Sequence, residues 1–144
     1  MNPRPLQQPR PPIVIAAMGP VMLKHTVRFA DTWNSLSFAA TFDERLEETR
    51  GQIAKVDALR AELGRDPASL TRSYLMFDPD ARTSGGQFGY YQSEEAFEET
   101  AQRVVELGIS DIGPYYPMQE AQLPMFEKIA RDVIPELKAR YAGT

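Results

Sequence analysis

The hydrophobic and polar positions along the chain follow two periods, one typical of short buried strands and one typical of amphipathic helices. Apolar, aromatic and β-branched runs predict four strands, at 13–15, 32–35, 70–77 and 109–112. Apolar residues at helical spacing predict four helices, at 20–31, 43–63, 94–107 and 123–141. Each strand precedes a helix, so the pattern predicts an α/β fold, (βα)4, with a parallel sheet and outer helices.

Residues that favour helix ends support these boundaries. Pro20 suits the first position of a helix, because its φ is fixed and its missing N–H is not needed there. Asp43 and Ser93 are predicted N-caps, and Gly64 is the predicted left-handed residue after the second helix. Pro135 is expected to kink or divide the last helix. The predicted apolar face of the first helix consists of Met22, Leu23, Val27, Phe29 and Ala30.

The turn between the first strand and the first helix has the features of an anion site. Small residues occupy most of 16–19, between the β-branched run 13–15 and Pro20. Such a turn leaves backbone N–H groups free at the positive end of a helix dipole. Many α/β proteins have such a turn and bind nothing at it, so the sequence leaves both interpretations open.

Composition and charge limit the possible functions. The chain has 144 residues, which predicts one domain (13–144) after a Pro-rich, extended lead-in (1–12). The net charge of −4 argues against a nucleic-acid-binding protein. No apolar run reaches membrane-spanning length and the lead-in lacks the apolar core of a signal peptide, so we predict a cytoplasmic protein without membrane contact. No cysteine and one histidine exclude disulfides, cysteine nucleophiles and His-rich metal sites, and we expect no metal.

Several segments resemble a known family. PPIVIAAMGPVMLKHTVRFADTWN (11–34), LGRDPASLTRS (63–73), LGISDI (107–112) and IARDVIPELKARY (129–141) resemble the carboxyl half of luciferase-like monooxygenases. The subgroup that uses the deazaflavin F420 is most similar, and users of FMN are near relatives. Members are TIM (β/α)8 barrels, so the resemblance implies half a barrel that corresponds to strands five to eight.

The resemblance implies a cofactor site but no catalytic residue. In relatives, a small-residue loop after the fifth strand presents backbone amides to the cofactor phosphate, and it corresponds to Ala17, Met18 and Gly19. Met18 replaces a usual glycine, which an amide contact tolerates where φ is negative. Asn34 and Ser35 fall where relatives line the same pocket. The family's acid and base residues lie mostly in the amino half, so catalytic residues remain unknown.

The implied function is that of an oxidoreductase that moves a hydride between F420 or FMN and a small organic substrate. The alternative is a non-catalytic half-barrel that binds a cofactor or a partner chain. Four βα units cannot close a barrel. We therefore expect a homo-oligomer of two copies or a separately encoded amino-half barrel, although a poorly folding remnant is also possible. A small flavodoxin-like domain is a third reading, and it requires neighbours on both sides of the first strand.

A few conspicuous side chains have simpler explanations than chemistry. His25 is expected at the surface, and Trp33 is expected in the core rather than against a cofactor. Turn formation explains Asp78 and Asp80 without a metal or substrate. The loop 78–92 carries Phe88, Tyr90 and Tyr91, which either contact a ligand or pack within the loop or on a second chain.

Overall fold

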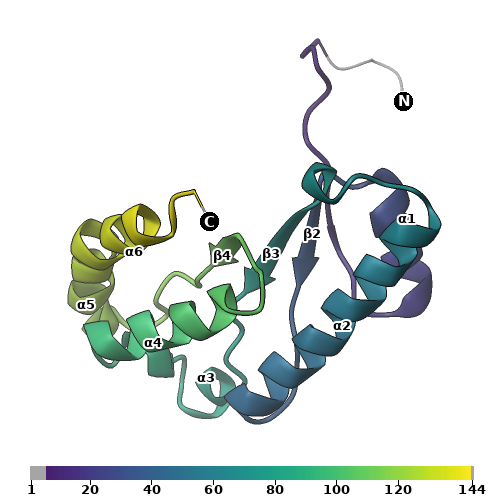
Figure 1. The fold of residues 1–144 in the computed structure, drawn as a ribbon. Helices are drawn as coiled ribbons and strands as arrows, with labels where there is room; N and C mark the ends of the chain where they lie inside the picture. Colours follow the sequence, from purple (N-terminus) through teal and green to yellow (C-terminus); the bar gives the residue numbers. More distant parts are fainter. Residues whose placement is uncertain (1–5, 144) are drawn as a thin grey trace.

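The computed structural model describes residues 6–143 and has the predicted α/β architecture (Figure 1). The strands are β1 (Val14–Ala16), β2 (Thr32–Ser35), β3 (Thr71–Leu75) and β4 (Asp111–Gly113). They form one parallel sheet in the order β1-β2-β3-β4. This order places β1 at an edge and rules out the flavodoxin-like alternative.

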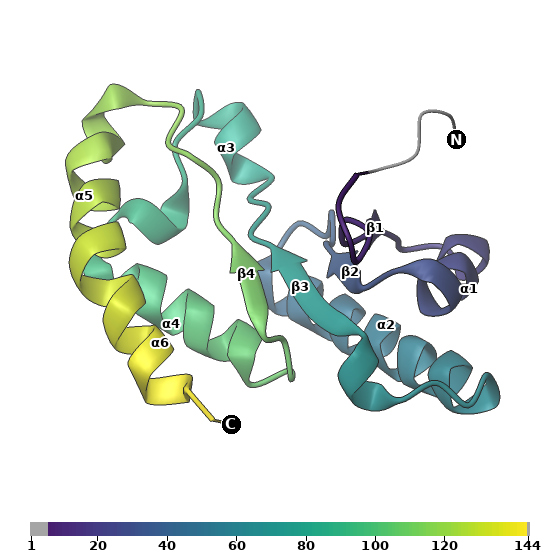
Figure 2. The same ribbon diagram turned by 90° about the horizontal axis from the view of Figure 1, so that it is seen from above.

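The helices form an arc around the strands (Figure 2). They are α1 (Pro20–Phe29), α2 (Phe42–Glu62), α3 (Asp80–Thr83), α4 (Glu94–Val105), α5 (Leu123–Lys128) and α6 (Ile134–Tyr141). Short helical turns lie at Pro67–Ser69, Gly89–Tyr91 and Glu120–Gln122. The observed β2 has the predicted bounds, whereas β3 is shorter than predicted and β4 begins two residues later.

The two faces of the sheet differ in burial. Register partners on neighbouring parallel strands point to the same face, so Trp33 and Tyr74 share the face that the helices cover, and both are buried. Asn34 and Ser73 are register partners on the opposite, concave face, where Ser73 is buried and Asn34 is half-buried. The core therefore lies between the sheet and the helices, and no helix of residues 6–143 covers the concave face.

The predicted apolar face of α1 is partly wrong. Leu23, Val27 and Ala30 are buried as expected, whereas Met22 and Phe29 are exposed. The helix packs on α2 and β2, which lie to one side of it. No element of the described chain lies on the other side of α1, beyond the edge strand β1. Part of the apolar stripe of α1 therefore stays exposed in this chain.

The N-cap of α2 is Thr41, not Asp43 as predicted. The Thr41 hydroxyl accepts from the Glu44 N–H (3.2 Å), and the Glu44 carboxylate accepts from the Thr41 N–H (3.1 Å), which completes a capping box. Two backbone donors are satisfied at once, which an Asp43 cap two residues later would not achieve. Asp43 instead pairs with Arg103 of α4 at 2.6 Å.

Ser93 and Gly64 occupy the predicted helix ends, whereas α1 and α4 end at Phe29 and Val105, each two residues earlier than predicted. Ser93 caps α4 by accepting from the Ala96 N–H at 3.1 Å, and Gly64 adopts a φ of +62° after α2. The last helical segment is divided as expected near Pro135. A π-helical turn at Ile129–Val133 joins α5 to α6, because the proline nitrogen cannot donate to the helical ladder.

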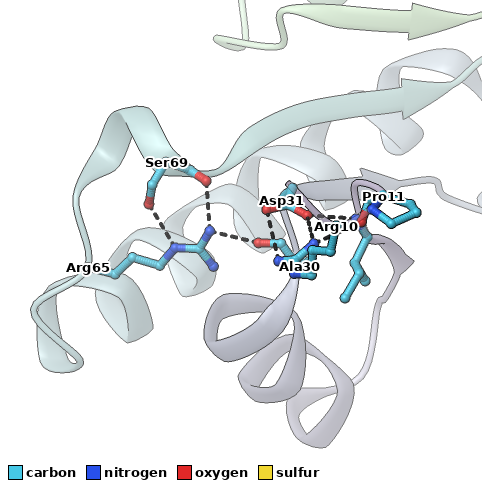
Figure 3. A network of polar contacts seen from close by, with 7 residues as sticks. Arg10, Pro11, Ala30, Asp31, Arg65 and Ser69 are labelled. Carbon is cyan, nitrogen blue, oxygen red and sulfur yellow. Dashed lines mark hydrogen bonds and ion pairs between the residues drawn. The ribbon is translucent and has the colours of Figure 1, made fainter. Parts of the chain in front are cut away.

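A polar network closes the amino end of β1–β3 (Figure 3). The Arg10 guanidinium binds the Asp31 carboxylate with both terminal nitrogens (2.6 and 3.2 Å), and the Ile13 N–H donates to the same carboxylate at 2.7 Å. The Arg65 guanidinium donates to the carbonyls of Val27 (2.6 Å), Ala30 (2.7 Å) and Ser69 (2.7 Å). Arg65 therefore caps the carboxyl end of α1 and ties it to the start of β3.

No helix among residues 6–143 is both long and apolar enough to cross a membrane. The cytoplasmic location stays a prediction. The predicted lead-in 1–12 lies partly outside the described residues, and the division at residue 12 also stays a prediction.

Candidate functional site

Two hydrogen bonds with β2 hold the loop between β1 and α1 in place. The Ala17 N–H donates to the Asn34 carbonyl (3.3 Å), and the Ala17 carbonyl accepts from the Trp33 indole N–H (2.9 Å). Trp33 is completely buried, so the predicted core role is confirmed. The same side chain thus fills the core and holds the loop in place.

The next backbone amides of the loop are free. The N–H groups of Met18 and Gly19 form no hydrogen bond within residues 6–143. Gly19 is the N-cap of α1 without a side-chain cap, and the first turn of α1 contains no acidic residue. A Cβ added to Gly19 would meet nothing within 4 Å, and its φ of −81° suits any residue. Two backbone N–H groups at the positive end of the helix dipole therefore have no partner among residues 6–143.

Asn34 and Ser35 do not share one environment. The Asn34 side-chain oxygen accepts from the Ser73 hydroxyl at 2.7 Å, which leaves the Asn34 amide group without a bond to the described residues. Ser35 is completely buried on the helix-covered face, and its hydroxyl donates to the Ser73 carbonyl at 2.9 Å. Of the two predicted residues, Asn34 can reach a ligand on the concave face, whereas Ser35 supports β3.

The aromatic residues of the loop 78–92 form a buried cluster. Phe88, Tyr90 and Tyr91 contact one another and are almost fully buried. Tyr91 also packs on Phe97 of α4 and Phe126 of α5, so the loop packs on these helices as well as within itself. The Gln122 amide holds Phe88 by accepting from its N–H (3.0 Å) and donating to its carbonyl (2.8 Å). Burial raises the pKa of Tyr91 to about 12 and raises that of Tyr90 further, so both hydroxyls stay protonated at neutral pH.

The Asp78 side chain of this loop has a structural role. The Asp78 carboxylate accepts from the N–H groups of Asp80 (3.1 Å) and Gly89 (3.0 Å), which is the predicted turn function. Residues 6–143 contain no group of three or more acidic or histidine side chains that could hold a metal ion. His25 is exposed as predicted and stacks on Phe29 at 6.2 Å.

Three aromatic rings that sequence reasoning did not single out lie beyond the carboxyl ends of β2, β3 and β4. Phe38 is 57% exposed and contacts Phe77 edge-on (5.1 Å between centroids), and Phe77 lies 6.5 Å from Tyr115. The Arg82 guanidinium lies over Phe77 at 5.3 Å. Apolar surface at the carboxyl edge of a parallel sheet is typical of ligand pockets. Periodicity did not reveal it, because Phe38 and Tyr115 lie outside the predicted strands and Phe77 was placed within the predicted strand 70–77, which ends at Leu75.

A cleft of about 410 Å³ opens beside these rings, between the start of α2 and α4. Arg45 and Tyr74 line it, and the Arg45 guanidinium donates to the carbonyls of Ala39 and Ala40, both at 3.0 Å. Burial raises the pKa of Tyr74, and the neighbouring Arg45 charge opposes that rise. The cleft lies on the helix-covered side of β3, apart from the loop 17–19.

Comparison of the sequence with models of protein families shows the family to which the chain belongs. The model of the luciferase-like monooxygenase family matches residues 1–81, more than half of the chain, including β1, β2 and β3. The chain belongs to the luciferase-like monooxygenase family. No curated protein matches it.

A solved structure shows how much of a luciferase-like fold is present. The chain is similar to the coenzyme F420 dependent tetrahydromethanopterin reductase from Methanopyrus kandleri, with a TM-score of 0.58 and 12% sequence identity. The match covers 87% of this chain and 50% of the reductase, so the chain spans about half the length of that protein. The fold is therefore a partial luciferase-like TIM barrel, as the resemblance implied.

Proposed function

We propose that the chain is the cofactor-phosphate half of a luciferase-like oxidoreductase that uses F420 or FMN and a small organic substrate. The free N–H groups of Met18 and Gly19 at the amino end of α1 carry this proposal. Family membership supports the class of cofactor, since the similar reductase depends on F420. In this proposal the half-barrel corresponds to strands five to eight of the complete fold.

The proposed contacts follow from the geometry of the loop. Met18 and Gly19 donate backbone N–H groups to a phosphate oxygen, and Asn34 adds its amide group from the concave face. Trp33 and Ala17 hold the loop rather than touch the ligand, because their polar groups already bond each other or β2. Ser35 contributes indirectly, through its bond to the Ser73 carbonyl.

The chain's own part in the reaction is to bind and orient the cofactor. The cofactor, when bound, supplies the hydride chemistry. Water must be kept from the concave face during such a step. Because the four strands leave that face open, the proposal requires four more strands from a partner chain or from a second copy.

A non-catalytic half-barrel is the second candidate. Its support is the open sheet, together with tyrosines whose hydroxyls are buried and bonded to backbone rather than directed at the concave face. The two candidates make the same prediction for cofactor binding and differ in turnover.

Comparing FMN with riboflavin tests the phosphate site, because the two flavins differ only in the phosphate. We expect FMN to quench its fluorescence on binding with an affinity about tenfold or more above that of riboflavin, which corresponds to about 1.4 kcal/mol. Inorganic phosphate should compete with FMN but not with riboflavin. Equal affinities for the two flavins would show that loop 17–19 does not bind phosphate. F420 is titrated in parallel, and binding without hydride transfer favours the non-catalytic candidate.

A further inference from the structure

The sheet has two free edges, and β1 exposes apolar surface at one of them. Val14 is 61% exposed and Ile13 is 39% exposed. Ile13 and Ala17 bond β2 through their backbones, so the backbone groups of the intervening Val14 and Ala16 point to the free edge. An apolar, unpaired edge strand is a site for pairing with another strand.

The helix α1, which follows β1, exposes three further large apolar side chains. Val21, Met22 and Phe29 are 69%, 47% and 59% exposed. Val14 points to the concave face, because it alternates with Ile13 and Ile15 along the strand, whereas Ile13 points to the face that the helices cover.

The opposite edge of the sheet carries a groove. It lies between β4, α4 and α6 and has a volume of about 360 Å³. Its walls are mostly apolar and include Phe97, Val105, Ile112, Ile134 and Leu137. The Gly113 carbonyl accepts a hydrogen bond from the N–H of Met76, the residue after β3, so the backbone groups of Ile112 point to the free edge beside the groove.

We propose that a second copy of this chain closes the sheet, with β1 of each copy paired to β4 of the other. The four strands are parallel and the helices lie on one side of them. A twofold rotation about an axis along the strands therefore gives eight parallel strands with every helix outside. Ile13 of one copy then enters the groove of the other, and Met22 and Phe29 lie near its α6.

The occupant is a second copy because the two edges of one chain complement each other. One edge carries the exposed apolar residues Ile13 and Val14, and the other lies beside an apolar groove. On both edges the N–H and C=O groups of every second residue point outwards. Twofold closure uses both edges of both chains at once, so the interface forms twice and no edge is left for further growth. The pairing of two copies does not depend on the proposed function. Only the further statement that this pairing completes the cofactor site rests on it.

Closure of an eight-stranded barrel also fixes the register between β1 of one copy and β4 of the other. Within the chain, Ala16, Asn34, Ser73 and Asp111 are successive register partners. An eight-stranded barrel of this class has a shear of about eight residues, hence about four for each half. A shift of four places Val14 of one copy beside Gly113 of the other, where the Val14 N–H meets the Ile112 carbonyl. A shift in the other direction would pair Asp111 with Pro20, which begins α1.

Engineered cysteines test this register, because the chain has no cysteine of its own. In the double variant Val14→Cys, Gly113→Cys the two positions of neighbouring copies lie about 5 Å apart, within the range for a disulfide. A Cβ at Gly113 meets only ordinary contacts, the nearest being Leu75 at 3.7 Å. The matched control Val14→Cys, Asp111→Cys separates the positions by about 8 Å. We expect mild oxidation to give a 14–113 disulfide dimer several-fold faster in the test variant than in the control.

The unmodified chain provides the second measurement. By light scattering after size exclusion, we expect a mass of twice 16.2 kDa. A monomer throughout the micromolar range, a 14–14 disulfide, equal rates in the two variants, or association only with a different chain would each overturn the inference. Circular dichroism confirms that both variants are folded. A 14–113 dimer that binds no FMN or F420 contradicts the proposed function and leaves this inference standing, whereas a monomer that binds FMN does the reverse.

Discussion

The amino and carboxyl ends of the β-strands are built in opposite ways. At the amino end, charged side chains and backbone groups are paired, with Arg10 on Asp31 and Arg65 on three carbonyls. At the carboxyl end, the amides of Met18 and Gly19 have no partner in the described chain, and Phe38 is exposed. The amino end pairs these polar groups within the fold, whereas at the carboxyl end the N–H groups of Met18 and Gly19 stay available.

This contrast matches the division of roles in complete α/β barrels. Their ligand sites lie at the carboxyl ends of the strands, and their amino ends serve stability. The proposed function assigns the same division to this half-barrel. Changes at the amino end should therefore alter the free energy of unfolding, and changes in loop 17–19 should alter ligand affinity.

The largest expected effect comes from Arg65→Ala. The substitution removes donors from the carbonyls of Val27, Ala30 and Ser69, which join α1 to the start of β3. Hydrogen bonds from a charged donor are strong, and we expect the free energy of unfolding to fall by about 2–4 kcal/mol. Urea denaturation followed by circular dichroism measures the change.

Arg65→Lys is the matched control for this experiment. It keeps the charge but replaces the planar fork by one ammonium group, so it should recover only part of the lost stability. The affinity for FMN should be unchanged in whatever fraction of either variant is folded. Full stability of Arg65→Ala would show that the amino end does not stabilise the fold, and the comparison between the two ends would fail.

The strand and helix pattern could be predicted from the sequence because it depends on local periodicity. The residues 32–35 form β2 as predicted, and Ser93 caps α4. The predictions that failed depend on which neighbours exist. Met22 and Phe29 fit the apolar stripe of α1, but burial requires a neighbour beyond β1, and periodicity does not report whether one is present.

Less of the candidate site than of the fold could be predicted from the sequence. The small-residue turn indicated free amides, but it did not show that Trp33 holds Ala17 while Met18 and Gly19 remain unbonded. Asn34 and Ser35 are adjacent in sequence and therefore point to opposite faces of the sheet, which separates their roles. The prediction of Asp43 as N-cap missed Thr41, although the spacing of Thr41 and Glu44 is that of a capping box.

Gly19→Asp tests the carboxyl end, with Gly19→Asn as its uncharged control. Both side chains fit the open space, and both are better N-caps than glycine, so stability should stay equal or rise by a few tenths of a kcal/mol. The aspartate carboxylate repels a phosphate, and we expect FMN affinity about tenfold or more below that of Gly19→Asn. Riboflavin affinity should be the same in both variants. Equal FMN affinity in the two variants would place the phosphate elsewhere.

The smallest expected effect is the pH dependence of the amino end. The Arg10 guanidinium, together with the Ile13 N–H, lowers the pKa of Asp31 below its ordinary value. A lowered pKa in the folded state gives a stabilisation that is present above the unfolded pKa of about 3.9 and is lost as the pH falls through the folded pKa. The melting temperature of the wild type should therefore fall more than that of Asp31→Asn when the pH is lowered from about 5 to about 3. Since this carboxylate is exposed to solvent, added salt should reduce the difference between the two proteins. If both melting temperatures fell equally, the Arg10–Asp31 pair would contribute nothing to stability, and the polar network of the amino end would depend on Arg65 alone.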